Sequence, residues 1–127
     1  MPAFSASAPG KIILFGEHAV VYGRPAIAAP VTQVRATATV YRALSGQGIL
    51  VQASDLHLEC PLDQVSGPDD PLYPIATTVR NTLRHLHVSG EPDLTIEVSS
   101  SVPMARGLGS GAALATAIVR ALASHCG

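Results

Sequence analysis

The chain has no tryptophan, only two phenylalanines and three tyrosines among its 127 residues. Proteins that hold single-stranded nucleic acid stack the bases on aromatic side chains, so this chain lacks the material for such a surface. Charge is also scarce, because eight Lys and Arg stand against nine Asp and Glu, giving a net charge of -1. Nucleic acids and anionic membrane surfaces are bound by concentrated positive charge, so neither is an expected partner.

Cysteines and long apolar runs are few as well. Cys60 and Cys126 are far apart and follow no metal-binding spacing, which favours free thiols in a reducing compartment. No long apolar core precedes Lys11, so a secretory signal is not expected. No apolar run is long enough to cross a bilayer. We therefore expect a soluble, cytoplasmic protein.

The chain is rich in apolar residues. Hydrophobic residues make up 47% of the sequence and charged residues 13%. This balance is typical of a packed globule, and the length suits one modest domain. There is no internal repeat, low-complexity tract or interdomain linker, so a single domain is expected.

The first half of the chain has the periodicity of strands. Residues 12–15 form a short apolar run after a Pro-Gly turn signal, and residues 32–41 alternate like a half-buried strand. Residues 49–53 are expected to pair back on 32–41 as a hairpin, and residues 56–60 alternate like a further strand.

The residue pattern in the second half of the chain predicts a helix, then a strand, then a second helix. Asp70 is expected to cap a helix that has Pro71 at its first position and ends before Gly90. Residues 94–98 alternate like a strand, and a last helix extends to about Ser124. The whole order predicts a mixed α+β domain.

A glycine-rich stretch, PMARGLGSGAALATA, precedes the last helix at residues 103–117. Glycines let a ligand approach the main chain, and a helix start offers unpaired N–H groups and partial positive charge. A strand, such a loop and a helix in series can therefore bind an anion, with the Ser110 hydroxyl available to a phosphate oxygen or a metal. The alternative is a tight loop that Ser110 merely caps. No Lys follows the glycines as in a Walker A loop, and the spacing differs from the dinucleotide fingerprint.

The last helix carries one narrow polar stripe, formed by Thr116, Arg120 and Ser124. Its other residues are apolar, so we expect this helix to be buried on most sides. Apolar helix surface left without cover would signal association or a missing partner.

A second cluster lies near the N-terminus, where Lys11, Glu17 and His18 bracket the apolar run 12–15. A strand between them can bring all three residues to one end of a sheet. The alternatives are a surface salt bridge, worth at most about 1 kcal/mol, and a hydrogen-bonded structural histidine.

Together, PGKIILFGEHAVVYGRPAIA and the downstream PMARGLGSGAA resemble the GHMP kinases, and within that superfamily most closely the mevalonate kinases. Galactokinases have Thr-Asp after the Glu-His pair, and phosphomevalonate kinases tend to have Glu-Tyr in place of that pair. The resemblance covers nearly the whole chain, but only the N-terminal part of such an enzyme.

The fold implied is α+β, ribosomal protein S5 domain 2-like, with a mixed sheet and helices on one face. Residues 1–127 would form a single, incomplete N-terminal ATP- and substrate-binding domain, without the C-terminal domain.

The resemblance implies a phosphotransferase that moves the γ-phosphoryl group of ATP, with Mg²⁺, to the 5-hydroxyl of mevalonate in isoprenoid precursor synthesis. Lys11 is the implied catalytic residue, beside the reacting hydroxyl. Glu17 and His18 would help form the mevalonate pocket. The implied phosphate-binding residues are Pro103, Arg106, Gly107, Leu108, Gly109, Ser110, Gly111 and Ala112.

The sequence departs from the family pattern in two places. The family loop usually reads Gly-Leu-Gly-Ser-Ser, and its second serine helps to hold Mg²⁺, whereas this chain has Gly111 there; Ser110 or a water would take over that role. The downstream Gly-Thr-Pro-Ser-Gly-type stretch and the catalytic aspartate are missing. The alternatives are therefore a non-catalytic fragment that binds nucleotide or forms a homodimer, or a kinase for phosphomevalonate, galactose or homoserine.

Overall fold

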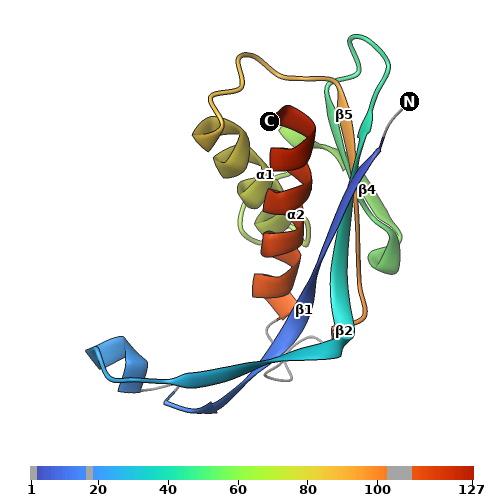
Figure 1. Ribbon diagram of the computed structural model, residues 1–127. Coiled ribbons are helices and arrows are strands. Elements are labelled where there is room, and N and C mark those ends of the chain that lie inside the picture. Colours follow the sequence, from blue (N-terminus) through green and yellow to red (C-terminus); the bar gives the residue numbers. More distant parts are fainter. Residues whose placement is uncertain (1–2, 17–18, 103–109) are drawn as a thin grey trace.

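The computed structural model describes residues 3–16, 19–102 and 110–127. Two helices cover one face of a single twisted sheet (Figure 1). The elements are β1 (Phe4–Phe15), η1 (Ala19–Tyr22), β2 (Ile27–Arg42), β3 (Ile49–Ala53), η2 (Ser54–Leu56), β4 (Leu58–Pro61), η3 (Leu62–Gln64), α1 (Tyr73–His85), β5 (Leu94–Ser100) and α2 (Ser110–Cys126).

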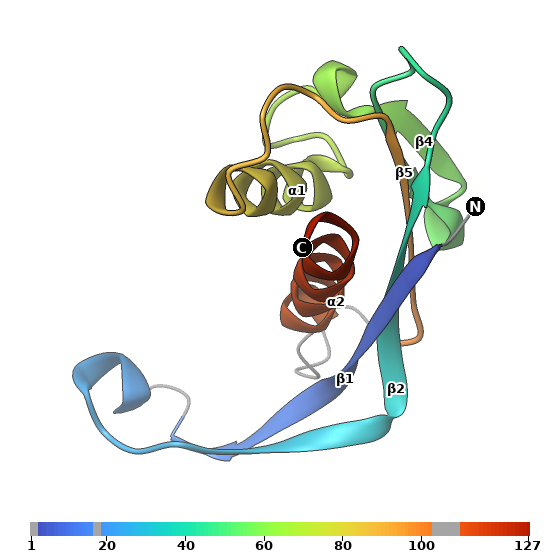
Figure 2. The same ribbon diagram turned by 45° about the horizontal axis from the view of Figure 1, so that its top comes forward.

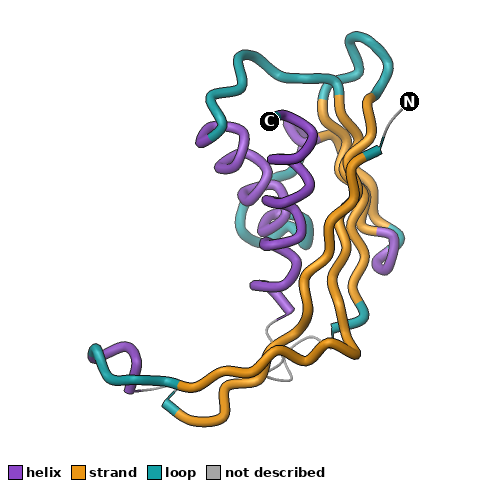
Figure 3. The backbone as a smooth tube through the Cα atoms, viewed as in Figure 1, coloured by secondary structure: helices purple, strands orange, loops and turns teal. Residues whose placement is uncertain are grey.

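The sheet has the strand order β1-β2-β5-β3-β4. β5 is antiparallel to β2 and parallel to β3, so the sheet is mixed. Figures 2 and 3 show α1 and α2 side by side on the same face. The predicted α+β class, with a mixed sheet and helices on one face, is confirmed.

The predicted hairpin between residues 32–41 and 49–53 is wrong, because β5 lies between β2 and β3. Asp93, the residue before β5, contacts the turn that joins β2 to β3. Its carboxylate accepts hydrogen bonds from the amides of Gly48 (2.7 Å) and Gly46 (3.1 Å). The turn after β2 is thereby tied to β5.

The Pro9-Gly10 turn signal does not end a strand, because β1 continues through it. Pro9 pairs with Arg35 and Gly10 with Val31, so a bulge of extra β2 residues absorbs the irregularity. Beyond this bulge, β1 and β2 continue as a two-stranded ribbon that leaves the body and carries η1 at its tip (Figures 1 and 2). We call the described residues 10–16 and 19–31 the arm.

Helix α1 begins three residues after its predicted cap. Leu72 precedes Tyr73 and makes no side-chain capping hydrogen bond. The Asp70 carboxylate instead accepts hydrogen bonds from the Leu72 amide (2.9 Å) and the Ser66 amide (3.1 Å), which shapes the turn before the helix.

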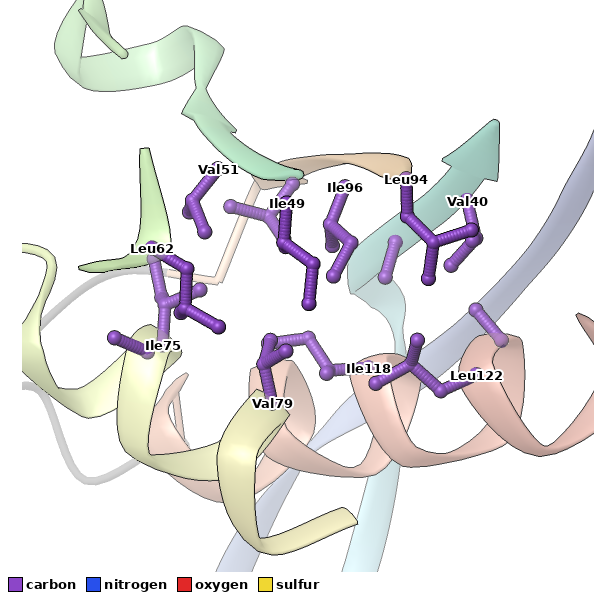
Figure 4. Close-up of a cluster of buried hydrophobic side chains, with 14 of the residues drawn as sticks. Val40, Ile49, Val51, Leu62, Ile75, Val79, Leu94, Ile96, Ile118 and Leu122 are labelled. Carbon is purple, nitrogen blue, oxygen red and sulfur yellow. The ribbon is translucent and has the colours of Figure 1, made fainter. Parts of the chain in front are cut away.

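The core lies between the two helices and the sheet (Figure 4). Ile118 and Leu122 of α2 meet Ile96 of β5 there, and all three side chains are buried. The alanines Ala113, Ala117 and Ala121 are also buried, so this face of α2 approaches the sheet closely.

The opposite face of α2 is more exposed than predicted. Thr116, Arg120 and Ser124 are exposed as expected, but Val119 is 43% exposed as well. Within the part of the chain that the structure describes, no helix or strand covers this side of α2. In the same part of the chain, no helix has the length and apolar character needed to cross a membrane.

Replacing Ile118 should test this packing. Ile118→Ala should lower the free energy of unfolding by about 3 kcal/mol, because the side chain is only 1% exposed and its loss leaves a cavity. Val119→Ala, one residue along the same helix, should cost less than about 1 kcal/mol. Urea unfolding of both variants would measure the difference, and equal losses would contradict the core assignment.

The Asp93 carboxyl group should make the free energy of unfolding depend on pH in the acid range. The hydrogen bonds from Gly48 and then Gly46 lower the pKa of its carboxyl below the usual 3.8. A lowered folded-state pKa gives stability that is present above the unfolded value and is lost as the pH falls through the folded value. Asp93→Asn should therefore be less stable at neutral pH and lose less stability between about pH 5 and pH 3.

Unfolding curves across this range would check the prediction. Asp69→Asn is the control, since Asp69 makes no side-chain hydrogen bond among the described residues. An identical acid dependence in the Asp93→Asn protein and the unmodified protein would rule out the proposed role of Asp93.

Candidate functional site

Helix α2 begins at Ser110, the position expected from the sequence. Ser110 is half-buried, and the next two residues, Gly111 and Ala112, are exposed. The first turn of a 17-residue helix carries N–H groups without partners inside the helix and the positive end of its dipole. This turn therefore has the electrostatic character of an anion site.

Among the described residues, the space beside Gly111 is open. A Cβ atom built on Gly111 would meet no heavy atom of these residues within 4 Å. Packing within the described residues therefore does not require glycine here. The open space allows a ligand to reach the helix end.

A cavity of about 250 Å³ lies beside the same turn. Its walls come from the start of α2, the end of β5, η2 and the start of α1. They are mostly apolar, with a few hydroxyl and carboxylate groups, which is the usual make-up of a small-molecule pocket. The lining residues are Ala53, Asp55, Leu56, Pro71, Pro74, Ile75, Val98, Ser99, Ser100, Val102, Ser110, Gly111 and Leu114.

Asp55 positions the end of β5 in this cavity wall. Its carboxylate accepts a hydrogen bond from the Ser100 amide, and the Ser100 hydroxyl accepts one from the Val102 amide at 3.1 Å. These bonds hold the chain where it leaves β5. No sequence motif marks Asp55 as part of the site, because its partner lies 45 residues away.

Lys11 lies on the arm, within β1 rather than at the strand end that the sequence suggested. It is half-buried, pairs with Pro30 of β2, and is the only lysine in the chain. Ala8, three residues earlier, is in one buried cluster with Ala36, Val102 and Ala113 of α2. At about 3.3 Å per residue, Lys11 lies roughly 10 Å further along the strand from that contact.

The remaining predicted site residues lie outside the described residues. They are Glu17, His18, Pro103, Arg106, Gly107, Leu108 and Gly109, and their roles stay predictions. Among the described residues, no group of three or more His, Cys, Asp or Glu side chains could hold a metal ion. Mg²⁺ binding by Ser110 therefore also stays a prediction.

Residues 74–127 match the family described as GHMP kinases N terminal domain. The chain is 34% identical over 135 residues to the mevalonate kinase of Thermococcus gammatolerans, covering 96% of this chain and 39% of that protein. It is 38% identical over 124 residues to the mevalonate kinase of Methanothermobacter thermautotrophicus, covering 97% of this chain and 37% of that protein. The chain thus spans about two fifths of the length of these relatives.

The crystal structure of Methanococcus jannaschii mevalonate kinase has the same fold, with a TM-score of 0.80, 26% identity and coverage of 98% of this chain and 40% of that chain. Streptococcus pneumoniae phosphomevalonate kinase is more distant, with a TM-score of 0.70, 17% identity and coverage of 98% of this chain and 36% of that chain, and shows the fold alone. In sequence and in fold, this chain is a GHMP kinase N-terminal domain. Within that superfamily, the sequence relatives named here are mevalonate kinases.

Gly111 and Gly16 should respond oppositely to substitution by alanine. Gly111→Ala should raise the free energy of unfolding by about 0.5 kcal/mol, because alanine favours the helix and meets no neighbour. Gly16→Ala should lower it, since Gly16 has φ +95° and a Cβ would lie 2.6 Å from the Pro25 carbonyl oxygen. Urea unfolding of both variants gives the signs, and a destabilising Gly111→Ala would show that the space at α2 is not open.

Proposed function

We propose that this chain is the N-terminal part of a mevalonate kinase, which phosphorylates the 5-hydroxyl of mevalonate at the expense of ATP. The observation that carries the proposal is the open first turn of α2 at Gly111, beside an apolar cavity of about 250 Å³. The mevalonate kinases among the relatives support mevalonate as the proposed substrate.

The phosphates of the nucleotide bind at the N-terminus of α2. The amides of Ser110, Gly111 and Ala112 belong to the first turn of the helix, where an anion is stabilised by N–H groups and by the dipole. The predicted loop residues 103 and 106–109 complete this cradle. The adjoining cavity then takes the flat aromatic base of the nucleotide, because its mostly apolar walls can pack against the faces of the ring.

Lys11 supplies positive charge beside the acceptor. Phosphoryl transfer depends mainly on positioning and on neutralising the charge that spreads over the transferred group. Strand β1 carries both Ala8, which packs in one cluster with α2, and Lys11. The strand therefore leads from the N-terminal end of α2, where the phosphates bind in this proposal, to Lys11 on the arm. Glu17 and His18 further along the chain hold the acidic substrate.

Ser110 is the proposed Mg²⁺ ligand. A Mg²⁺ ion held there would supply positive charge that neutralises the phosphates. It keeps several waters and needs few protein ligands, so one hydroxyl at the start of α2 fits its chemistry. Gly111 has no side-chain hydroxyl. Ser110 therefore provides the side-chain hydroxyl of the described first turn of α2.

Turnover belongs to the complete protein. Its relatives are about two and a half times as long as the matched region, and no aspartate of this chain is assigned as the base. We therefore propose that the 127-residue chain binds nucleotide without rapid catalysis.

The single lysine allows a direct binding test. The only amines of the 127-residue chain are Lys11 and the α-amino group, so after hydroxylamine removes any thioesters and aryl esters, mass spectrometry can follow the stable amide at each site separately. MgATP should slow acylation of Lys11 about tenfold at saturation, by shielding the ammonium with phosphate, and should leave the α-amino group unchanged. Ser124→Ala, at the far end of α2, is the matched control for Ser110→Ala, which should weaken the protection. Equal acylation with and without MgATP would refute nucleotide binding at this place.

The complete protein encoded by the reading frame tests the substrate. It should phosphorylate mevalonate in an ATP-dependent assay, and Lys11→Ala should lower kcat by about 10³-fold while the protein stays folded. Arg84→Ala, on α1, should have near-normal kcat. Turnover of galactose or homoserine and none of mevalonate would contradict the substrate assignment.

A further inference from the structure

The arm exposes an unusual amount of apolar side chain. Seven of the twelve exposed large hydrophobic residues of the described chain lie on it, with exposures between 42% and 83%. They are Ile12, Leu14, Phe15, Val20, Val21, Tyr22 and Ile27. Figures 1 and 3 show the arm standing away from both helices, so no described element covers it.

The large apolar side chains of the ribbon gather on one face. Ile12 pairs with Ala29 and Phe15 with Ile27, across a bulge at Leu14, so Ile12 and Phe15 lie on the same face of the ribbon. Leu14 and Phe15 are 58% and 59% exposed. Phe15 pairs with Ile27, which is also exposed, so each strand contributes to the apolar surface.

The arm has no third strand to support it. β5 pairs with β2 only at Ala36–Arg42, on the other side of the bulge. An isolated two-stranded ribbon is at best marginally stable in water. The strand segments 12–15 and 27–31 also contain no charged residue, although exposed strands usually carry charge to avoid aggregation. The composition is that of a buried ribbon.

We infer that the polypeptide that follows the N-terminal domain in the longer relatives packs over this arm and buries its apolar face. The length of the relatives favours this occupant: about three fifths of each relative lies outside the match. A patch of this size on an otherwise well-packed domain marks an interaction surface. The inference concerns packing and does not depend on which substrate the protein phosphorylates.

The test compares the 127-residue chain alone with a chimera in which it is followed by the unmatched remainder of the Thermococcus gammatolerans enzyme. Hydrogen exchange of residues 10–15 and 27–31 should be fast in the chain alone and about 100-fold slower in the chimera, because burial suppresses local opening. β5 should be protected in both proteins and serves as the internal reference. A chimera with a protected β5 and an unprotected arm would overturn the inference.

A pair of surface substitutions distinguishes burial from a general effect of charge. Leu14→Asp should leave the melting temperature of the chain alone nearly unchanged but lower that of the chimera by about 5 °C or more. Leu44→Asp is the matched control, because Leu44 is 80% exposed and lies in the turn after β2. Equal small shifts for both substitutions in the chimera would refute the interface. If the chimera does not fold, grafting residues 10–31 alone into the Thermococcus enzyme allows the same comparison.

A second copy of this chain is the competing occupant. Light scattering of the chain alone should give the mass of a monomer at micromolar concentration. A stable dimer that Leu14→Asp dissociates and Leu44→Asp does not would assign the arm to self-association and overturn the inference. Neither result requires ATP or mevalonate. The packing inference can therefore be refuted while the proposed kinase function stands, and the kinase function can be refuted while the packing inference stands.

Discussion

The close contact between the alanine face of α2 and the first two strands is the constraint on which the rest of the structure depends. Ala113 of α2 meets Ala8 of β1 and Ala36 of β2 in a fully buried cluster. Side chains this small let the helix backbone approach the sheet, and larger residues would lift the helix away. The same contact fixes the position of the first turn of α2, because Ala113 follows Ser110 by three residues.

That position joins the two parts of the candidate site. On one side of the turn, Ser100 and Asp55 form the polar edge of the cavity, held by the bond from the Ser100 amide to the Asp55 carboxylate. On the other side, β1 continues from Ala8 through the bulge to Lys11. A helix end placed elsewhere over the sheet would keep its dipole but lose one of these neighbours. The site is therefore a consequence of packing as much as of its motif.

The sequence predicts local features of this fold well and long-range ones poorly. The start of α2 at Ser110 follows from glycines next to strong helix formers, a preference that acts within a few residues. The place of β5 between β2 and β3 rests on backbone pairing between segments more than 40 residues apart, and the Asp93 carboxylate adds bonds to the Gly46 and Gly48 amides over a similar separation. The bulge at Pro9-Gly10 is similar, since the same dipeptide can end a strand or bend it, and only the register of β2 decides which.

For the candidate site, the sequence predicts residues of the loop and the helix start but gives no indication of the cavity beside them. Asp55 lies in η2 between two short strands, where nothing local distinguishes it from any other turn carboxylate. It becomes part of the site only because the parallel pairing of β3 with β5 brings η2 to the end of β5. Motifs identify the groups that touch a ligand, whereas the groups that shape the wall come from the topology.

The arm adds a constraint on how such a site can be completed. Lys11 and Ile12 are adjacent in β1, so their side chains lie on opposite faces of the ribbon. A polypeptide that covers the apolar face at Ile12 therefore leaves the Lys11 face to be enclosed separately. A segment that also covered Lys11 would remove water from the surroundings of its ammonium group and so strengthen its electrostatic interaction with any nearby anion. While the Lys11 face stays open, water and salt screen that interaction.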